Sequence, residues 1–151
     1  MARTFRAVTL WLALAAPAIP AAAETCPWLN AATAGGVLGG AVTATVTHAN
    51  ANREDATCSF VRTGAQLTIE VVTMDTPRSE YTAHAAQCGS DPVALKAIGN
   101  EAVTCTDEHG AKVVSRVRNK IFTIIVASSD PPATLREKAR SVAEQVAGNL
   151  F

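Results

Sequence analysis

The cysteines constrain the fold of this chain more than any other feature of its sequence. All four follow the first 25 residues, at Cys26, Cys58, Cys88 and Cys105. An even number of cysteines in a small exported domain is typical of a disulfide framework, and we expect two bridges. Loop closure at these spacings contributes about 3 kcal/mol per bridge, which is comparable with the net stability of a small domain. The cysteines can therefore stabilise a fold whose core is modest, provided that the compartment is oxidising.

Residues 1–23 are typical of a secretory signal peptide. Two arginines precede a short apolar segment, residues 7–19, and the three alanines at 21–23 provide small residues for cleavage. The apolar run is shorter than the roughly 20 residues that span a bilayer, so we expect no stable membrane anchor after cleavage. The predicted mature chain begins at Glu24 and lies in the periplasm or outside the cell.

Cys26 has an alternative role as the lipid-bearing first residue of a lipoprotein. Bacterial lipoproteins place a small residue directly before the modified cysteine, whereas Thr25 precedes Cys26 here and the charged Glu24 comes before it. Stable anchoring would also usually need a second membrane signal. We therefore expect Cys26 to form a disulfide, with lipidation as the alternative.

The mature segment is long enough for a single domain, residues 24–151, with one core. Cleavage leaves 128 residues, which include 11 Lys and Arg against 13 Asp and Glu, a net charge of −2. A near-neutral domain lacks the electrostatic footprint of a nucleic-acid-binding protein. We expect no nucleic acid among its partners.

The first half of the mature segment predicts one helix and three strands. Asn30 is the expected N-cap of a helix over residues 31–38, which Gly39 ends because glycine readily adopts the left-handed conformation. Apolar and polar side chains alternate most clearly in residues 66–73. Strands are expected over residues 41–47, 55–61 and 66–73.

The second half repeats this order and adds a helix. Thr76 and Pro77 are expected to start a helix that runs to about Cys88. A last helix is expected from Ser129 or Asp130, after strands over residues 100–106, 111–117 and 121–127. Because short turns rather than crossover helices link the strands, we expect an α+β fold with three helices and an antiparallel sheet of about five to six strands. The predicted order is helix, three strands, helix, three strands, helix.

An internal echo favours one pairing of the cysteines. Residues 57–67 and 104–113 both contain Thr-Cys followed by Gly-Ala, so Cys58 and Cys105 occupy matching positions. Four cysteines allow three pairings, and we prefer the one that joins each half to its own preceding helical segment, Cys26 with Cys58 and Cys88 with Cys105. A metal or redox site is the alternative, which the absence of a Cys-x-x-Cys pair disfavours.

Several of these features occur together in a known type of protein. The segment "CPWLNAATAGGVLGG", a cysteine close to an aromatic residue in "CSF", "GNEA" before the late strands, a hairpin with a basic tip and a terminal amphipathic helix are present in this order. The chain resembles the small exported bacterial domains of unknown function carried by many lipoproteins and by extracytoplasmic kinase sensors. This resemblance implies an α+β domain with two disulfides and a binding rather than a catalytic role.

Basic residues near one predicted hairpin form the main candidate binding site. Lys112, Arg116 and Arg118 share strand parity, and Lys120 lies just past the turn. Such a surface suits a small anionic ligand or an acidic protein partner, because guanidinium groups bind carboxylate and phosphate. The alternative is a solvated strand face that is kept polar to prevent edge pairing.

The turn "TDEHG" is the main candidate for metal chemistry. Asp107, Glu108 and His109 supply ligand-type side chains, but a polar hairpin turn closed by Gly110 explains the same residues. We therefore expect a soluble, exported, non-catalytic binding domain without a metal or cofactor. The alternative function is a small exported metal-dependent hydrolase that uses this turn.

Overall fold

The computed structural model describes residues 24–49, 54–89 and 91–151. The predicted signal peptide, residues 1–23, lies outside them. Within the described residues the chain forms three helices, α1 (Ala31–Leu38), α2 (Pro77–Ala86) and α3 (Pro132–Leu150). The strands are β1 (Thr43–His48), β2 (Ala56–Arg62), β3 (Ala65–Thr73), β4 (Val93–Leu95), β5 (Glu101–Asp107), β6 (Gly110–Val117) and β7 (Lys120–Ser128).

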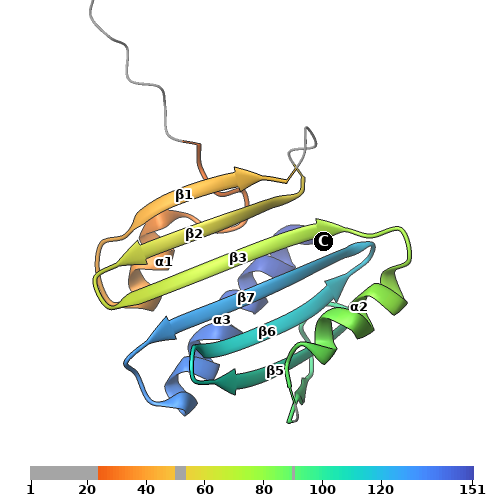
Figure 1. Cartoon of the computed structure of the whole chain (residues 1–151). Helices are drawn as coiled ribbons and strands as arrows, with labels where there is room; N and C mark the ends of the chain where they lie inside the picture. The colour runs from red at the N-terminus through yellow and green to blue at the C-terminus, as the bar shows by residue number, and fades with distance from the viewer. Residues whose placement is uncertain (1–23, 50–53, 90) are drawn as a thin grey trace, which may run out of the picture.

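These strands form one antiparallel sheet in the spatial order β1-β2-β3-β7-β6-β5-β4 (Figure 1). The α+β class, the antiparallel sheet and the three helices are confirmed. The predicted number of five to six strands is wrong, because β4 adds a seventh and makes the second group four strands. With three residues, β4 is too short to show alternation in the sequence, and it is a strand only because it pairs with residues 102–104 of β5.

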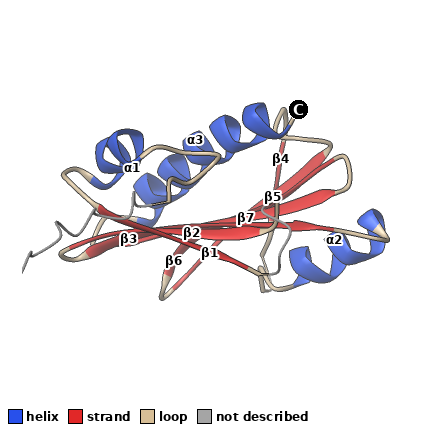
Figure 2. Ribbon diagram, turned by 90° about the horizontal axis from the view of Figure 1, so that it is seen from above, coloured by secondary structure: helices blue, strands red, loops and turns tan. Residues whose placement is uncertain are grey.

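The helices divide unequally between the two faces of the sheet (Figure 2). On one face, α3 packs on β5, β6 and β7, while α1 packs on β2 and β3. The main core lies here, because alternation turns the apolar side chains of each strand to this side. The largest fully buried side chains of this core are Phe60, Leu67, Ile69, Ile98, Phe122 and Ile124.

On the opposite face, α2 builds a smaller cluster over β6 and β7. Tyr81 packs there with Met74, Val114 and Ile121. Burial, and to a lesser extent the charge of Glu101, raises the pKa of the Tyr81 hydroxyl. α2 therefore covers the face of the sheet opposite the main core.

The helix ends follow the sequence signals with two corrections. The Asn30 side chain accepts a hydrogen bond from the Thr33 N–H at 2.8 Å, and Gly39 ends α1 with φ of 80°, both as predicted. The Thr76 side chain does not cap α2; instead the Glu80 carboxylate accepts bonds from both the N–H and the hydroxyl of Thr76 at 2.8 Å. α3 starts at Pro132, later than expected.

Both predicted disulfides are present. Cys26 is bonded to Cys58, at a sequence separation of 32, and Cys88 to Cys105, at a separation of 17. The first bridge joins the segment before α1 to β2, and the second joins the end of α2 to β5. Each half of the chain is thus tied to its own helical segment. In the part of the chain that the structure describes, no helix is long and apolar enough to cross a membrane.

Candidate functional site

Two of the four cations in the predicted basic patch are held by carboxylates. Nε of Arg116, on β6, donates to Oε1 of Glu101 at 2.7 Å, and both side chains are partly buried. Nζ of Lys120, at the start of β7, donates to Oε2 of Glu54 at 2.9 Å and lies 3.3 Å from the Thr73 hydroxyl. A carboxylate that already holds a cation weakens the attraction of that cation for a ligand anion.

The other two cations lie apart from each other. β6 ends at Val117, so Arg118 lies in the turn that follows the strand, with φ of 54°. Its guanidinium lies 5.8 Å from the ring centre of Phe151. Lys112 is on β6 opposite Cys105, on the face that α2 covers. The predicted anion site remains a prediction, but the structure does not gather its four cations into one cluster.

The acidic turn has a structural explanation. Oδ1 of Asp107 accepts the backbone N–H groups of His109 and Gly110 at 2.8 and 3.1 Å, and so closes the hairpin between β5 and β6. Glu108 and His109 are highly exposed, with 85% and 79% of their side-chain surfaces accessible. Among the described residues, no group of three or more His, Cys, Asp or Glu side chains could hold a metal ion.

Partly buried carboxylates elsewhere also stabilise backbone or neighbouring side chains. Oδ1 of Asp55, a residue only 7% exposed, accepts the N–H and the hydroxyl of Thr73 at 2.9 and 2.6 Å. Asp130 accepts from Ser128 and from Lys138, and these bonds, with the Lys138 contact the largest, lower the pKa of its carboxyl. These carboxylates are hydrogen-bond acceptors that hold neighbouring parts of the fold together.

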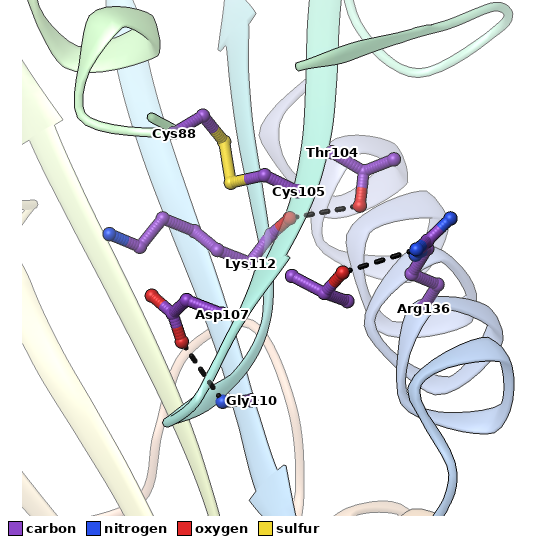
Figure 3. The surroundings of a disulfide bond; sticks show 8 residues. Cys88, Thr104, Cys105, Asp107, Gly110, Lys112 and Arg136 are labelled. Atoms are coloured by element: carbon purple, nitrogen blue, oxygen red, sulfur yellow. Dashed lines mark hydrogen bonds between the residues drawn. A yellow bond between two sulfur atoms is a disulfide. The ribbon is translucent and has the colours of Figure 1, made fainter. Parts of the chain in front are cut away.

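A cavity of about 440 Å³ lies beside the Cys88–Cys105 disulfide. It is lined by residues 87–89 and Asp91 after α2, by the first residue of β4, by the last residues of β5 and by one residue of α3. Figure 3 shows this region, with the disulfide on one side of β5 and Arg136 on the other. The lining residues are Gln87, Cys88, Gly89, Asp91, Val93, Thr104, Cys105, Thr106, Asp107 and Arg136. The cavity therefore wraps around the outer edge of β5.

The cavity brings together charges of both signs. Nη2 of Arg136 donates to the Thr106 hydroxyl at 3.1 Å, which holds the guanidinium against the edge of β5. The carboxylates of Asp91 and Asp107 line the same space. A guanidinium presents five N–H donors in a rigid fork. In the described part of the chain, Arg136 uses one of them on Thr106. The site can therefore bind a carboxylate at one position and a cation at another.

Sequence reasoning missed this site for two reasons. Arg136 and Thr106 are 30 positions apart, and no local pattern links them. The cavity also depends on the short β4, which leaves part of β5 uncovered and gives no sequence signal of its own. The pairing of Cys88 with Cys105 was the one available indication that the end of α2 lies beside β5.

Comparison with known proteins found no match: no family model, no curated protein and no solved structure resembles this chain closely enough to assign a relative.

Proposed function

We propose that this chain is an exported, disulfide-stapled, non-catalytic domain that binds a ligand or a protein partner in the cavity beside Cys88–Cys105. Two intramolecular disulfides are typical of proteins in oxidising compartments, which supports export. The predicted signal peptide and the resemblance to small exported bacterial domains favour the same compartment. The single observation that carries the binding role is the cavity itself, which holds a guanidinium and carboxylates.

The cavity has the features of a recognition site. Its volume of about 440 Å³ lies in the range of small-ligand sites in proteins, and its few polar groups come from three separate elements. Secondary structure positions most of them, because Thr104, Thr106 and Asp107 lie on β5 and Arg136 lies in α3. Groups held by helices and strands keep their geometry better than groups on loops.

No observation favours the metal-dependent hydrolase. Asp107 is engaged with the backbone of its own turn, and Glu108 and His109 project into solvent. The proposal therefore assigns the turn a structural role.

The proposal can be tested by NMR titration of the oxidised chain from Glu24 to Phe151 with a panel of free amino acids, short peptides and inorganic phosphate. We expect at least one compound to shift the backbone amides of Gly89, Thr106 and Asp107 saturably, since these residues line the cavity. The amides of Thr45 and Ser59, on the far strands β1 and β2, are the control and should not move. Shifts confined to the turn around Arg118 would instead support the basic patch, and no shift at the cavity would contradict the proposal.

A second experiment tests export. Expression with the complete N-terminus in a Gram-negative host should yield a periplasmic protein whose first residue is Glu24 and whose mass lacks four hydrogens relative to the reduced chain. An acylated Cys26, or a folded cytosolic protein with four free thiols, would contradict it.

A further inference from the structure

One stretch of the sheet edge next to the cavity lacks a partner strand. β4 pairs with residues 102–104 of β5, but β5 continues to Asp107. Within the described residues, Cys105–Asp107 pair with β6 on one side and with no strand on the other. Because β-strands carry a backbone donor and acceptor at alternate positions on each side, an uncovered edge can accept another extended chain.

The cavity lies at this uncovered edge. Gly89, with φ of 74°, and Asp91 line the cavity, and β4 begins only at Val93. Val93, which begins β4 opposite Thr104, lines the cavity and is 53% exposed. Because Pro92 is joined to Val93 and lies within about 3.8 Å of it, the space for an extended chain is beside Thr106 and Asp107, about 7 Å of strand or roughly two residues.

Alternation along β5 gives the two faces of this edge different chemistry. Cys105 and Asp107 point to the face of α2, where Cys105 is bonded to Cys88. Thr106 points to the face of α3, where its hydroxyl accepts from Arg136. A residue opposite Thr106 therefore meets the guanidinium, and a residue opposite Asp107 meets a carboxylate.

The direction of the sheet decides which end of a peptide would reach Arg136. A chain antiparallel to β5 passes Asp107 first and Thr106 next, and then meets Pro92, which lies beside Cys105 because the adjoining Val93 pairs with Thr104. The peptide has to end there, so its terminal carboxylate lies beside Arg136 and its penultimate side chain lies beside Asp107. The Thr106 hydroxyl accepts from Arg136, which leaves its own O–H to donate to that carboxylate.

Resting on the proposed function, we infer that the cavity captures the free C-terminal end of an extended polypeptide. The peptide adds to the uncovered edge of β5, its terminal carboxylate binds Arg136 and Thr106, and a basic penultimate side chain faces Asp107. Strand addition and capture of a terminal carboxylate are both established modes of peptide recognition.

The inference is tested with the peptide acetyl-Thr-Val-Lys-Val, labelled on an additional N-terminal residue and measured by fluorescence anisotropy on the oxidised mature chain. The matched control is the same peptide with a C-terminal amide, which lacks only the negative charge. We expect saturable binding of the free acid and roughly tenfold weaker binding of the amide, because a charge-assisted hydrogen bond is lost. A peptide with Glu in place of the penultimate Lys should also bind more weakly.

Variants of α3 identify the residue responsible. Arg136→Gln should bring the affinities for acid and amide close together, whereas Arg140→Gln should leave their ratio unchanged. Arg140 is a suitable control because it lies one turn further along the same helix and pairs with Glu144 in solvent. N-methylation of the last peptide bond removes a backbone donor. It should weaken binding of the free-acid peptide without changing the charge of that peptide.

The outcomes separate this inference from the proposed function. Equal binding of acid and amide, an effect of Arg140→Gln as large as that of Arg136→Gln, or no binding of the free acid would each overturn it. If the peptides do not bind, but phosphate or an amino acid still shifts the NMR signals of the cavity amides, the proposed function stands without peptide capture. If no compound shifts those NMR signals, both the proposed function and the peptide inference are contradicted.

Discussion

The two disulfides perform different tasks in the two halves of the molecule. Cys58 is fully buried, and its bridge to Cys26 belongs to the main core between the sheet and its two helices. Cys88 is 8% exposed, and its bridge to Cys105 lies outside both apolar clusters, beside the cavity. The first bridge is surrounded by apolar packing. The second holds a helix whose only buried residue is Tyr81.

This difference shows that the same covalent bond lies within the core in one place and borders a cavity in another. Loop closure alone predicts similar contributions, about 3.7 kcal/mol for a separation of 32 residues and about 3.1 kcal/mol for 17. Any larger difference between the two bridges has to come from packing.

Removing each bridge should give the largest effects. We expect the variant Cys26→Ala with Cys58→Ala to lose about 5 kcal/mol of unfolding free energy, because the truncated Cys58 also leaves a cavity in the core. The variant Cys88→Ala with Cys105→Ala should lose about 3 kcal/mol. Urea denaturation without reductant measures both, with the remaining bridge verified by mass. Equal losses would show that packing around Cys58 adds nothing to loop closure.

Glycine replacement compares the backbones of the two halves. Gly99, with φ of 63°, approaches β6 so closely that a Cβ atom would lie 2.4 Å from the carbonyl oxygen of Arg116. We expect Gly99→Ala to cost about 3 kcal/mol, from strain and steric overlap. Gly36→Ala in α1 is the control, because nothing lies within 4 Å of its added Cβ, and it should stabilise the protein by up to about 1 kcal/mol. Thermal unfolding distinguishes these opposite signs.

A matched pair of isoleucines on β7 compares the two faces of the sheet. Ile124 belongs to the main core and Ile121 to the cluster under α2, and each is at most 1% exposed. We expect Ile124→Val to cost about 1.5 kcal/mol and Ile121→Val about 0.5 kcal/mol, since the smaller cluster can relax around a lost methyl group. Chemical denaturation of both variants tests this. A larger loss at Ile121 would mean that α2 packs as tightly as α3.

The smallest expected effect is the pH dependence of α2. Hydrogen bonds from the backbone and then the side chain of Thr76 lower the pKa of Glu80 below its ordinary value of 4.5. A carboxyl whose pKa is lower in the folded state stabilises that state above its unfolded pKa, and this stabilisation disappears as the pH falls through the folded pKa. Amide exchange in the first turn of α2 should therefore accelerate, relative to α1, below pH 4.5. Glu80→Gln keeps a hydrogen-bond acceptor but cannot titrate, so it should remove this acceleration. If amide exchange in that variant keeps the same pH dependence, the bonds between Glu80 and Thr76 are not its cause.

Local signals in the sequence predicted most of the fold. Asn30 and Gly39 mark the ends of α1, and the alternation of Leu67, Ile69 and Val71 identifies the buried face of β3, because capping and pleating involve only neighbouring residues. The echo between the halves also indicated the two disulfide pairs. β4 was not predicted, because three residues are too few to show the alternation of apolar and polar side chains that marks a strand.

The candidate site was far less predictable. Strand parity placed Lys112 and Arg116 on one face correctly, but parity says nothing about the carboxylates that neutralise such cations. Lys120 and its partner Glu54 are 66 positions apart. The cavity needs the end of α2, the uncovered edge of β5 and one residue of α3 in the same place.

The sequence by itself determined the α+β class and the limits of α1 and indicated the two cross-links, because each rests on interactions within a few residues or on the small number of ways to pair four cysteines. Only the tertiary structure decided which cations are neutralised, which face each helix covers and where a cavity remains. Those features arise from contacts between distant segments, and the energy of such contacts depends on a geometry that no short stretch of sequence contains.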